Sequence, residues 1–432
     1  GYSSAASDVY KRQGQCMPLV FWKERTEEME IDIIGLLNAF SYALDCVEAE
    51  LVHVTTRHGK RVAYISVCMA ENMGITGDEL TDLAACALLH DNALLQYIQE
   101  EFRKGAEEQT DKSMTPKQVA MHCVYGEKNL KNYPFHTDVT NVILYHHENA
   151  DGSGPFRKTW EETPLFARMI HLADKVDTFC KTDALTEEIW EKTKNYILKY
   201  RGRKFDEECA ECFLQSFGKE RFFRLASEEL EEYLWKDVPH RKEYYSYEAL
   251  RKLADLFAGI IDYKSEFTGR HSLGVAAKAA EITEYMGYDR ETVEKMYFAG
   301  ALHDIGKIIV GNDILEKPAR LTEEEFAHMK DHASCTYMLL SGIEGMEEIR
   351  DWAAFHHEKL DGSGYPFGKT AEELSEPERI MACADIYQAL VEDRPYKKGM
   401  DHEKACSIMN DMAERNWIDP NIVHCIQKMY QK

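Results

Sequence analysis

The sequence has no long hydrophobic run. None of its 432 residues belongs to an apolar stretch of about 18 side chains, and the N-terminus lacks the charged-then-apolar pattern of a secretory signal. We therefore expect a soluble, cytoplasmic protein with no membrane association. The 12 cysteines show no framework spacing, which favours a reducing compartment. The single C-x-x-C, Cys209 and Cys212, is interpreted as two thiols on one helix.

An excess of positive charge is also lacking. The formal net charge is −24, which argues against DNA binding, because affinity for phosphate backbones comes from excess lysine and arginine. An anionic substrate must then be bound by metal ions and a few local cations.

Proline and strand-like alternation are scarce, which predicts an all-α fold. The chain contains 11 prolines, and helical periodicity dominates from about residue 30 onward. Apolar residues between Ile33 and Val47 form a stripe at helical spacing, predicting a core helix. Residues 1–29 are expected to be a tail or disordered lead.

The chain contains its own duplicate. One series of histidines and aspartates is repeated in the same order and at nearly constant spacing. The first series is His58, His90, Asp91, His122, His146, His147 and Asp174; the second is His271, His303, Asp304, His332, His356, His357 and Asp385. We therefore predict two tandem helical-bundle domains, residues 30–236 and 237–432, related by pseudo-two-fold symmetry as an intramolecular pseudo-dimer.

The second series has the ligand types of a two-metal centre. A lone histidine is more often an ordinary core or surface residue, but an ordered set with two aspartates favours metal binding. Nitrogen and oxygen ligands without thiolate suit iron or manganese, with zinc, nickel or magnesium as alternatives. We expect Asp304 to bridge two divalent ions, one held by His271, His303 and Asp385 and the other by His332, His356 and His357. Lys307 would neutralise phosphate charge in catalysis.

A glycine-rich loop follows the His356–His357 pair. It contains Gly364, Tyr365 and Pro366, and it is either a plain turn or a segment whose backbone approaches substrate while Tyr365 stacks on a base or sugar. Arg379 and Arg394 lie on either side of Asp385 and are candidate phosphate contacts, although such arginines are often solvated ion-pair partners.

These motifs together resemble the HD-GYP subgroup of the HD phosphohydrolase superfamily. The matching segments are His303-Asp304-Ile305-Gly306-Lys307, His356-His357-Glu358, Asp361-Gly362-Ser363-Gly364-Tyr365-Pro366, Ala384-Asp385 and Asp393-Arg394-Pro395-Tyr396. The resemblance implies an α-helical phosphodiesterase that hydrolyses cyclic di-GMP to pGpG or GMP at a centre of two or three metals. It also implies that the loop recognises substrate and contacts diguanylate cyclase domains. Three-metal members carry a glutamate four residues before the first histidine; here Phe267 stands there, so we expect two metals.

The first copy departs further from the resemblance. Its ligand series is complete, but Ala93 and Leu94 replace the glycine and lysine of the HD-x-G-K segment, and Pro155 stands where the loop tyrosine would be. This favours a metal-binding domain that is slow, altered in substrate or regulatory. The competing hypothesis is a working site that uses Lys175 or Arg168 as its cation.

The favoured function is a cyclic-dinucleotide phosphodiesterase using a metal-bridging hydroxide, with cyclic di-GMP ahead of cyclic GMP-AMP. One alternative is hydrolysis of another nucleotide, or di-iron oxygenase chemistry, which Lys307 and the intact loop disfavour. A non-enzymatic alternative is a nucleotide-binding signalling module with weak turnover. Fold resemblance alone does not decide the substrate.

Overall fold

The protein is represented by a computed structural model. It describes residues 28–51, 57–94, 96–97, 116–180, 185–236, 238–239, 242–262, 271–315, 317, 319–393 and 398–431. The described elements are almost all helical, as the sequence predicted. The elements before residue 237 are β1 (Glu28–Ile31), α1 (Ile33–Leu51), α2 (His58–Asn72), α3 (Asp78–Leu88), α5 (Pro116–Leu130), η1 (Trp160–Glu162), α6 (Leu165–Cys180), α7 (Glu187–Tyr200), α8 (Glu207–Ser216), α9 (Lys219–Arg224) and α10 (Leu230–Trp235).

The second half repeats much of this order. Its elements are β2 (Glu243–Ser246), α11 (Tyr247–Asp262), α12 (His271–Tyr285), α13 (Arg290–Leu302), η3 (Ile305–Ile309), α14 (Asn312–Leu315), α15 (Glu323–Ser341), α16 (Glu347–Ala354), α17 (Glu376–Val391), α18 (His402–Glu414) and α19 (Pro420–Met429). Helices α2 and α12 both begin at the first histidine of a ligand series, so the sequence repeat is also a structural repeat. We call the two halves the N-terminal copy and the C-terminal copy.

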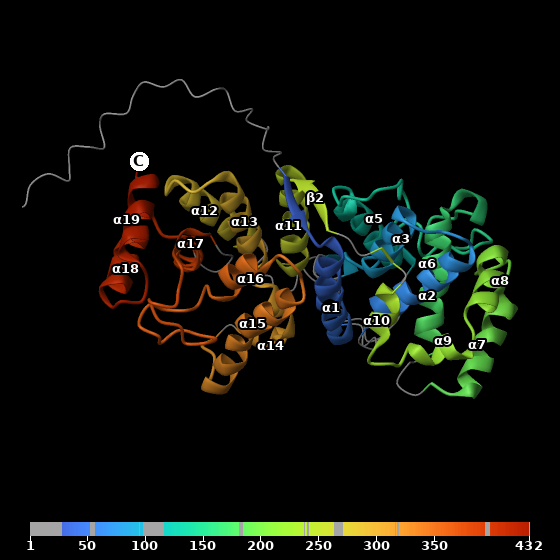
Figure 1. The fold of residues 1–432 in the computed structure, drawn as a ribbon. Helices are drawn as coiled ribbons and strands as arrows, with labels where there is room; N and C mark the ends of the chain where they lie inside the picture. The colour runs from blue at the N-terminus through green and yellow to red at the C-terminus, as the bar shows by residue number, and fades with distance from the viewer. Residues whose placement is uncertain are drawn as a thin grey trace, which may run out of the picture.

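A two-stranded ribbon joins the copies, and the sequence did not predict it. Strands β1 and β2 pair antiparallel, with Glu28 opposite Ser246 and Ile31 opposite Glu243. Each strand leads directly into the first helix of its copy. Figure 1 shows β1, β2, α1 and α11 between the two lobes. Glu28 and Met29, which the sequence analysis placed in the tail, therefore belong to the fold; residues 1–27 lie outside the described residues.

The helix α1 is a core element of both copies. The predicted stripe is buried from Ile33 to Leu44, and Leu36, Leu37 and Phe40 have no exposed surface; the side chain of Val47 lies outside the described part. The Phe40 ring stacks on Phe257 of α11 with centroids 3.4 Å apart. Helix α1 also contacts η3 and α15 of the C-terminal copy. One hydrophobic cluster therefore continues through both copies, so the halves share their core.

Capping residues fix the first turns of α15 and α17, the two helices that carry His332 and Asp385. The Thr322 side chain accepts a hydrogen bond from the Glu325 amide (3.2 Å), while Glu325 accepts one from the Thr322 amide (2.7 Å). This reciprocal pair satisfies amides that the first helical turn leaves unbonded, and it begins α15. Ser375 and Glu378 form the same motif at the start of α17, which has a proline in its first turn. These two helices carry His332 and Asp385.

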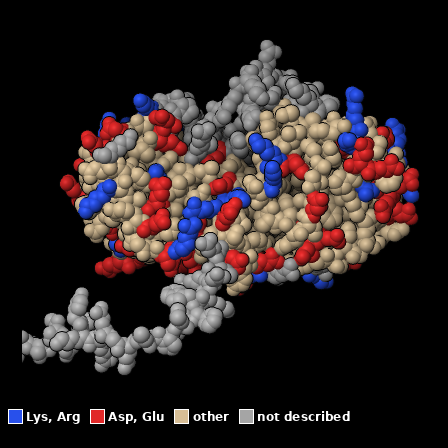
Figure 2. Space-filling model, turned by 90° about the horizontal axis from the view of Figure 1, so that it is seen from above, with Lys and Arg blue, Asp and Glu red and all other residues tan. Residues whose placement is uncertain are grey.

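The surface is mixed in charge. Figure 2 shows acidic side chains in scattered groups on the visible face, with fewer groups of lysines and arginines among them. This distribution follows the net charge and offers no broad basic area on that face. Among the described residues, no helix combines the length and apolarity needed to cross a membrane.

Candidate metal centre

The structure brings the second series of histidines and aspartates into two adjoining groups. The ligand atoms of His271, His303 and Asp304 lie within 4.8 Å of one another, and so do those of His332, His356 and His357. These residues come from the start of α12, the turn after α13, the middle of α15 and the turn after α16. Asp385 of α17 completes the set, with its Oδ1 3.1 Å from His271 Nε2 and 3.9 Å from His303 Nε2.

Asp304 lies between the two groups. Its Oδ2 is 3.2 Å from His303 Nε2, and its Oδ1 is 3.6 Å from His332 Nε2. The side chain is buried, yet Oδ1 has no hydrogen-bond partner. A buried carboxylate oxygen without a partner is costly unless a cation or donor occupies the adjacent space. This feature fits a carboxylate that contacts a metal ion on each side.

Backbone carbonyls orient three of the imidazoles. The Nδ1 atoms of His303, His332 and His356 donate to the carbonyls of Gly300 (2.7 Å), Met329 (2.5 Å) and Ala353 (2.7 Å). Each bond fixes the tautomer, so the Nε2 lone pairs point toward Asp304 and one another. Burial lowers the pKa of His356 well below its usual value and that of His357 to about 3. Neutral imidazoles are the form that binds metal.

His271 has a different environment. Its Nε2 faces Asp385, and its Nδ1 lies 3.1 Å from Glu392 Oε2. Burial alone would lower the pKa of His271, but hydrogen bonds to these two carboxylates raise it to about 9. The sequence analysis missed Glu392. Its position about two helical turns beyond Asp385, on the same helix face, was the available signal.

In each copy, a buried aspartate outside the repeated series accepts a hydrogen bond from the residue that follows the first histidine. Asp262 Oδ1 accepts a hydrogen bond from Ser272 Oγ (2.7 Å), and Asp45 Oδ1 accepts one from the Gly59 amide (3.0 Å). Burial raises the pKa of Asp262 to about 7 and that of Asp45 to about 6. The residues after His271 and His58 are thus held from α11 and α1, the helices at the junction of the copies.

Lys307 is placed where the sequence analysis expected a cation. Its Nζ lies 2.5 Å from Asp304 Oδ2. Burial by itself raises the pKa of Asp304, but His303 and Lys307 lower it well below its usual range. The lysine reaches the carboxylate because Gly306 lets the turn pack directly on α15. A Cβ at Gly306 would lie 1.9 Å from the His332 carbonyl oxygen, so only glycine fits.

Replacing Gly306 with alanine is expected to destabilise the C-terminal copy. The added methyl group meets backbone atoms of α15, so the turn or the helix must shift at a cost of about 1–3 kcal/mol. Chemical or thermal denaturation measures this change. Gly342→Ala is the matched control because a Cβ there has no atom within 4 Å, and we expect a change below about 0.5 kcal/mol. Equal stability of the two variants would contradict this account of Gly306.

The loop after the histidine pair is anchored by Glu358. Its carboxylate accepts hydrogen bonds from the amides of Phe367 (2.7 Å), Gly368 (3.1 Å) and Lys369 (2.9 Å). The sequence analysis quoted Glu358 within a motif but gave it no role. Glu148 accepts bonds from Phe156 (2.7 Å) and Lys158 (2.5 Å) in the other copy, so the anchor is repeated.

The anchored loop brings Tyr365 to the histidine cluster. Its ring centroid is 4.7 Å from that of His357, and its amide donates to the His357 carbonyl (3.2 Å). Gly364 has no room for a side chain, because a Cβ would lie 2.4 Å from the Lys359 amide nitrogen. Pro366 follows Tyr365 through a cis peptide bond. The loop thus lies beside the site, as predicted from the sequence.

The structure gives Arg379 a different role from the predicted phosphate contact. Its guanidinium bonds Asp419 (3.1 Å) and the carbonyls of Leu374 (3.1 Å) and Ala371. All three nitrogens are therefore used to fasten α17 to its surroundings. Arg394 lies outside the described residues, as does position 267, on which the expectation of two rather than three metals was based.

The first series is also gathered into two groups. One contains His58, His90 and Asp91, and the other contains His122, His146, His147 and, unexpectedly, Cys123. Asp91 Oδ1 faces His122 Nε2 (3.3 Å) and His146 Nε2 (3.6 Å). Asp174 lies 3.7 Å from His58 Nε2 and 3.6 Å from His147 Nδ1. His90 Nε2, His146 Nε2 and Asp91 Oδ1 are buried without partners, so this cluster also fits a metal site.

Lys175, one of the two candidate cations of the first copy, lies at its histidine–aspartate cluster. Leu94 occupies the position of Lys307 and is buried, while Lys175 Nζ lies 2.8 Å from Asp174 Oδ2. Arg168, the other candidate, instead pairs with Asp206 at 3.0 Å. That pair corresponds to Arg379 and Asp419 in the C-terminal copy, so both arginines have the same structural contact.

A buried ion pair orients His58. Its Nδ1 is 2.7 Å from Asp177 Oδ2, and Asp177 also binds Arg61 through Nε (2.5 Å) and Nη2 (3.0 Å). Arg61 and Asp177 are both buried. The corresponding residues of the C-terminal copy are Gly274 and Gln388, which lie against each other. At these two positions the N-terminal copy thus has a buried ion pair, and the C-terminal copy has a glycine beside a glutamine side chain.

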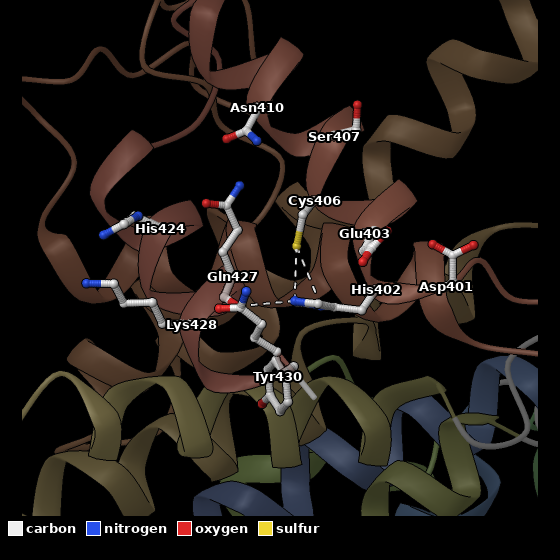
Figure 3. Close-up of a pocket in the computed structure, with 11 residues that line it drawn as sticks. Asp401, His402, Glu403, Cys406, Ser407, Asn410, His424, Gln427, Lys428 and Tyr430 are labelled. Atoms are coloured by element: carbon white, nitrogen blue, oxygen red, sulfur yellow. Dashed lines mark hydrogen bonds between the residues drawn. The ribbon is translucent and has the colours of Figure 1, made fainter.

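A separate hollow carries none of the predicted site residues. It has a volume of about 930 Å³ and lies between α18 and α19, where Figure 3 shows His402 and His424 among its walls. His402 is held at both nitrogens, by the Tyr387 hydroxyl (3.0 Å) and the Gln427 carbonyl (3.1 Å). Neither histidine belongs to the two repeated series, and for His402 these contacts explain its position.

The duplicated helical fold and its two histidine–aspartate clusters define an HD-type domain pair. The HD domain family model matches residues 44–209 and 255–422, so the chain belongs to that family, with HD-GYP-type motifs in a tandem arrangement. The chain is 29% identical over 411 residues to 3'3'-cGAMP-specific phosphodiesterase 1 of Vibrio cholerae, covering 92% of this chain and 93% of that protein.

Other relatives match with different extents. The chain is 31% identical over 313 residues to 3'3'-cGAMP-specific phosphodiesterase 3 of Vibrio cholerae, covering 72% of this chain and 67% of that protein. A cyclic di-GMP phosphodiesterase of Pseudomonas aeruginosa is 37% identical over 165 residues, 38% of this chain and 39% of that one. The crystal structure of a cyclic GMP-AMP-specific phosphodiesterase of Vibrio cholerae superposes with a TM-score of 0.65 at 24% identity, covering 94% and 99% of the two chains, which concerns the fold.

Proposed function

We propose that the chain is a metal-dependent phosphodiesterase that hydrolyses a cyclic dinucleotide in its C-terminal copy. The observation that carries this proposal is the buried Asp304 carboxylate, which has Nε2 atoms of His303 and His332 on its two sides and Lys307 in contact. The sequence analysis placed cyclic di-GMP first. The relatives that span most of this chain are named for 3'3'-cGAMP, and we therefore put 3'3'-cGAMP first and cyclic di-GMP second.

The C-terminal ligand set divides between two divalent ions. His271, His303 and Asp385 would hold one ion, His332, His356 and His357 the other, and Asp304 would contact both. Such ions, iron or manganese first, would supply an activated water and neutralise charge on the scissile phosphate. The two groups of ligand atoms support this division.

The chain's own residues bind and orient the dinucleotide. Lys307 extends from a turn packed on α15, so its ammonium is held beside Asp304, where it meets a non-bridging phosphate oxygen. Tyr365 is held against His357 by the Glu358-anchored loop and offers a ring face to a base. Burial of the imidazoles excludes bulk water from the reacting phosphate, which strengthens both contacts.

The paired copies form the frame for this site. We propose domain boundaries at residues 30–236 and 237–432 and an intramolecular pseudo-dimer, supported by the β1–β2 ribbon and the stacking of Phe40 on Phe257. The loop also presents Phe367, which is 53% exposed. We retain contact between this loop and a diguanylate cyclase domain as a prediction.

Hydrolysis assays test the proposed activity. The purified full chain, loaded with Mn²⁺ or Fe²⁺, is incubated with 3'3'-cGAMP, cyclic di-GMP and cyclic di-AMP, and products are separated chromatographically. We expect 3'3'-cGAMP to be cleaved fastest. Lys307→Met should lower kcat by about 10²–10³-fold, since a positioned charge on the reacting phosphate is lost.

Lys295→Met is the matched control for Lys307→Met. Lys295 pairs with Glu291 and Glu348 on the surface (both 2.9 Å), so its loss should leave kcat unchanged. Failure of the metal-loaded wild-type chain to cleave any of the three dinucleotides would refute the proposed function. A full-rate Lys307→Met variant would refute the role given to that lysine.

A further inference from the structure

The N-terminal copy contains a cavity beside its own histidine cluster. It has a volume of about 320 Å³, which lies at the small end of the range for ligand pockets, and its walls include His147, Gly154, His171, Lys175 and Lys204. From these walls we infer that the N-terminal copy binds a nucleoside monophosphate. This inference is independent of which substrate the C-terminal copy hydrolyses.

Two lysines face the same small cavity of a strongly acidic chain. Lys175 Nζ lies 2.8 Å from Asp174 Oδ2, the counterpart of Asp385, whereas Lys307 contacts Asp304 in the other copy. Among the described residues, Lys204 has no carboxylate at ion-pair distance, and its ammonium instead lies 4.6 Å from the centroid of the Tyr200 ring. A lysine without a carboxylate partner beside a paired one favours an anionic ligand, and phosphate is the anion that such lysines commonly bind.

His171 supplies the second, independent feature. It is 97% buried, with a relative exposure of 3%, and its Nδ1 donates to the His146 carbonyl at 3.0 Å. That bond makes Nε2 an acceptor, and Nε2 has no partner. The C-terminal copy has Ala382 at this position, so the histidine belongs to this cavity alone. A buried acceptor without a protein partner at a cavity wall favours a ligand that carries a donor.

The two features together select the class of ligand. Inorganic phosphate would satisfy the lysines, but it fills little of a cavity of about 320 Å³. A nucleoside monophosphate carries the phosphate together with ribose hydroxyls and a base that can donate to Nε2. The loop here ends in Gly154 and Pro155 and lacks the tyrosine that lies beside the other site. The N-terminal cavity is therefore a binding site rather than a second copy of the proposed hydrolytic site.

Binding of GMP and AMP to the full chain tests this inference. Titrations are made in the Lys307→Met background, so that the C-terminal site contributes little, with inorganic phosphate as the competitor. We expect saturable binding of one equivalent of GMP or AMP. Adding Lys175→Met and Lys204→Met should weaken it at least about tenfold, and His171→Ala should weaken nucleotide binding while leaving phosphate competition unchanged.

The matched control is Lys192→Met. Lys192 is exposed and pairs with Glu188 at 2.7 Å on α7, outside the cavity, so nucleotide affinity should not change. Lys204→Gln alone is the variant of choice if the double replacement unfolds, as judged by circular dichroism. The inference is overturned if the lysine variants bind GMP and AMP like the parent. It is also overturned if inorganic phosphate competes as strongly as the nucleotide itself binds.

Discussion

Asp304→Ala should abolish hydrolysis while the protein remains folded. The replacement removes the carboxylate that lies between the two histidine groups and the partner of Lys307. Stabilisation of several kcal/mol at the reacting phosphate is lost with it, which corresponds to a fall in kcat of roughly 10³-fold or more. The same protein should bind less metal. Assays of 3'3'-cGAMP cleavage and metal analysis of the same sample measure the two effects together.

Asp91→Ala is the matched replacement in the N-terminal copy. Asp91 has the same place among His90, His122 and His146, so its loss removes the equivalent charge without touching the C-terminal site. We expect hydrolysis to be largely retained and metal content to fall. Strong loss of activity in a folded Asp91→Ala protein would show that the N-terminal cluster takes part in turnover. Unchanged activity of Asp304→Ala would remove the basis of the proposed site.

Arg61→Met should strongly destabilise the N-terminal copy. The arginine is buried and makes two hydrogen bonds to Asp177, which is buried as well. Its loss leaves the buried Asp177 carboxylate beside His58 without its arginine, and breaking a buried ion pair from one side costs about 3–5 kcal/mol. Denaturant unfolding of the full chain measures this loss. A decrease below about 1 kcal/mol would contradict the importance given to the pair.

The C-terminal copy supplies a control for this prediction. It has Gly274 and Gln388 at the positions of Arg61 and Asp177, in close approach and without an ion pair. The double replacement Arg61→Gly with Asp177→Gln should therefore be more stable than Arg61→Met, because no buried charge is left uncompensated. A double variant that is less stable than the single variant would show that the surrounding N-terminal core requires the ion pair itself.

The two histidine–aspartate clusters were predictable because the sequence contains the series twice. Two series of histidines and aspartates in one order identify equivalent positions without any alignment of other proteins. The helical periodicity likewise predicted α1 and its buried stripe, including Phe40. Lys307 was predicted to act on phosphate, and the structure adds that its ammonium contacts Asp304, three residues away in the same short turn.

Other features depend on contacts between distant residues. Strands β1 and β2 have four residues each, and the sequence of the whole N-terminal copy separates them. Neither is therefore long enough to show a strand pattern, and the pairing cannot be predicted from neighbouring residues. Sequence could not choose between Lys175 and Arg168, since both lie on α6; their different partners, Asp174 and Asp206, are set by packing. Arg379 was misplaced for the same reason. It lies near Asp385 in the sequence, but its side chain pairs with Asp419 and does not reach the histidine cluster.

The packing of α1 on η3 makes the two halves dependent on each other. Helix α1 belongs to the N-terminal copy in sequence, but it contacts the turn Ile305–Ile309 that holds Lys307. A chain cut near residue 237 would leave the catalytic turn without one of its walls and would expose the apolar face opposite Phe257. The N-terminal copy is therefore a structural part of the C-terminal fold, and separating the two would disturb both.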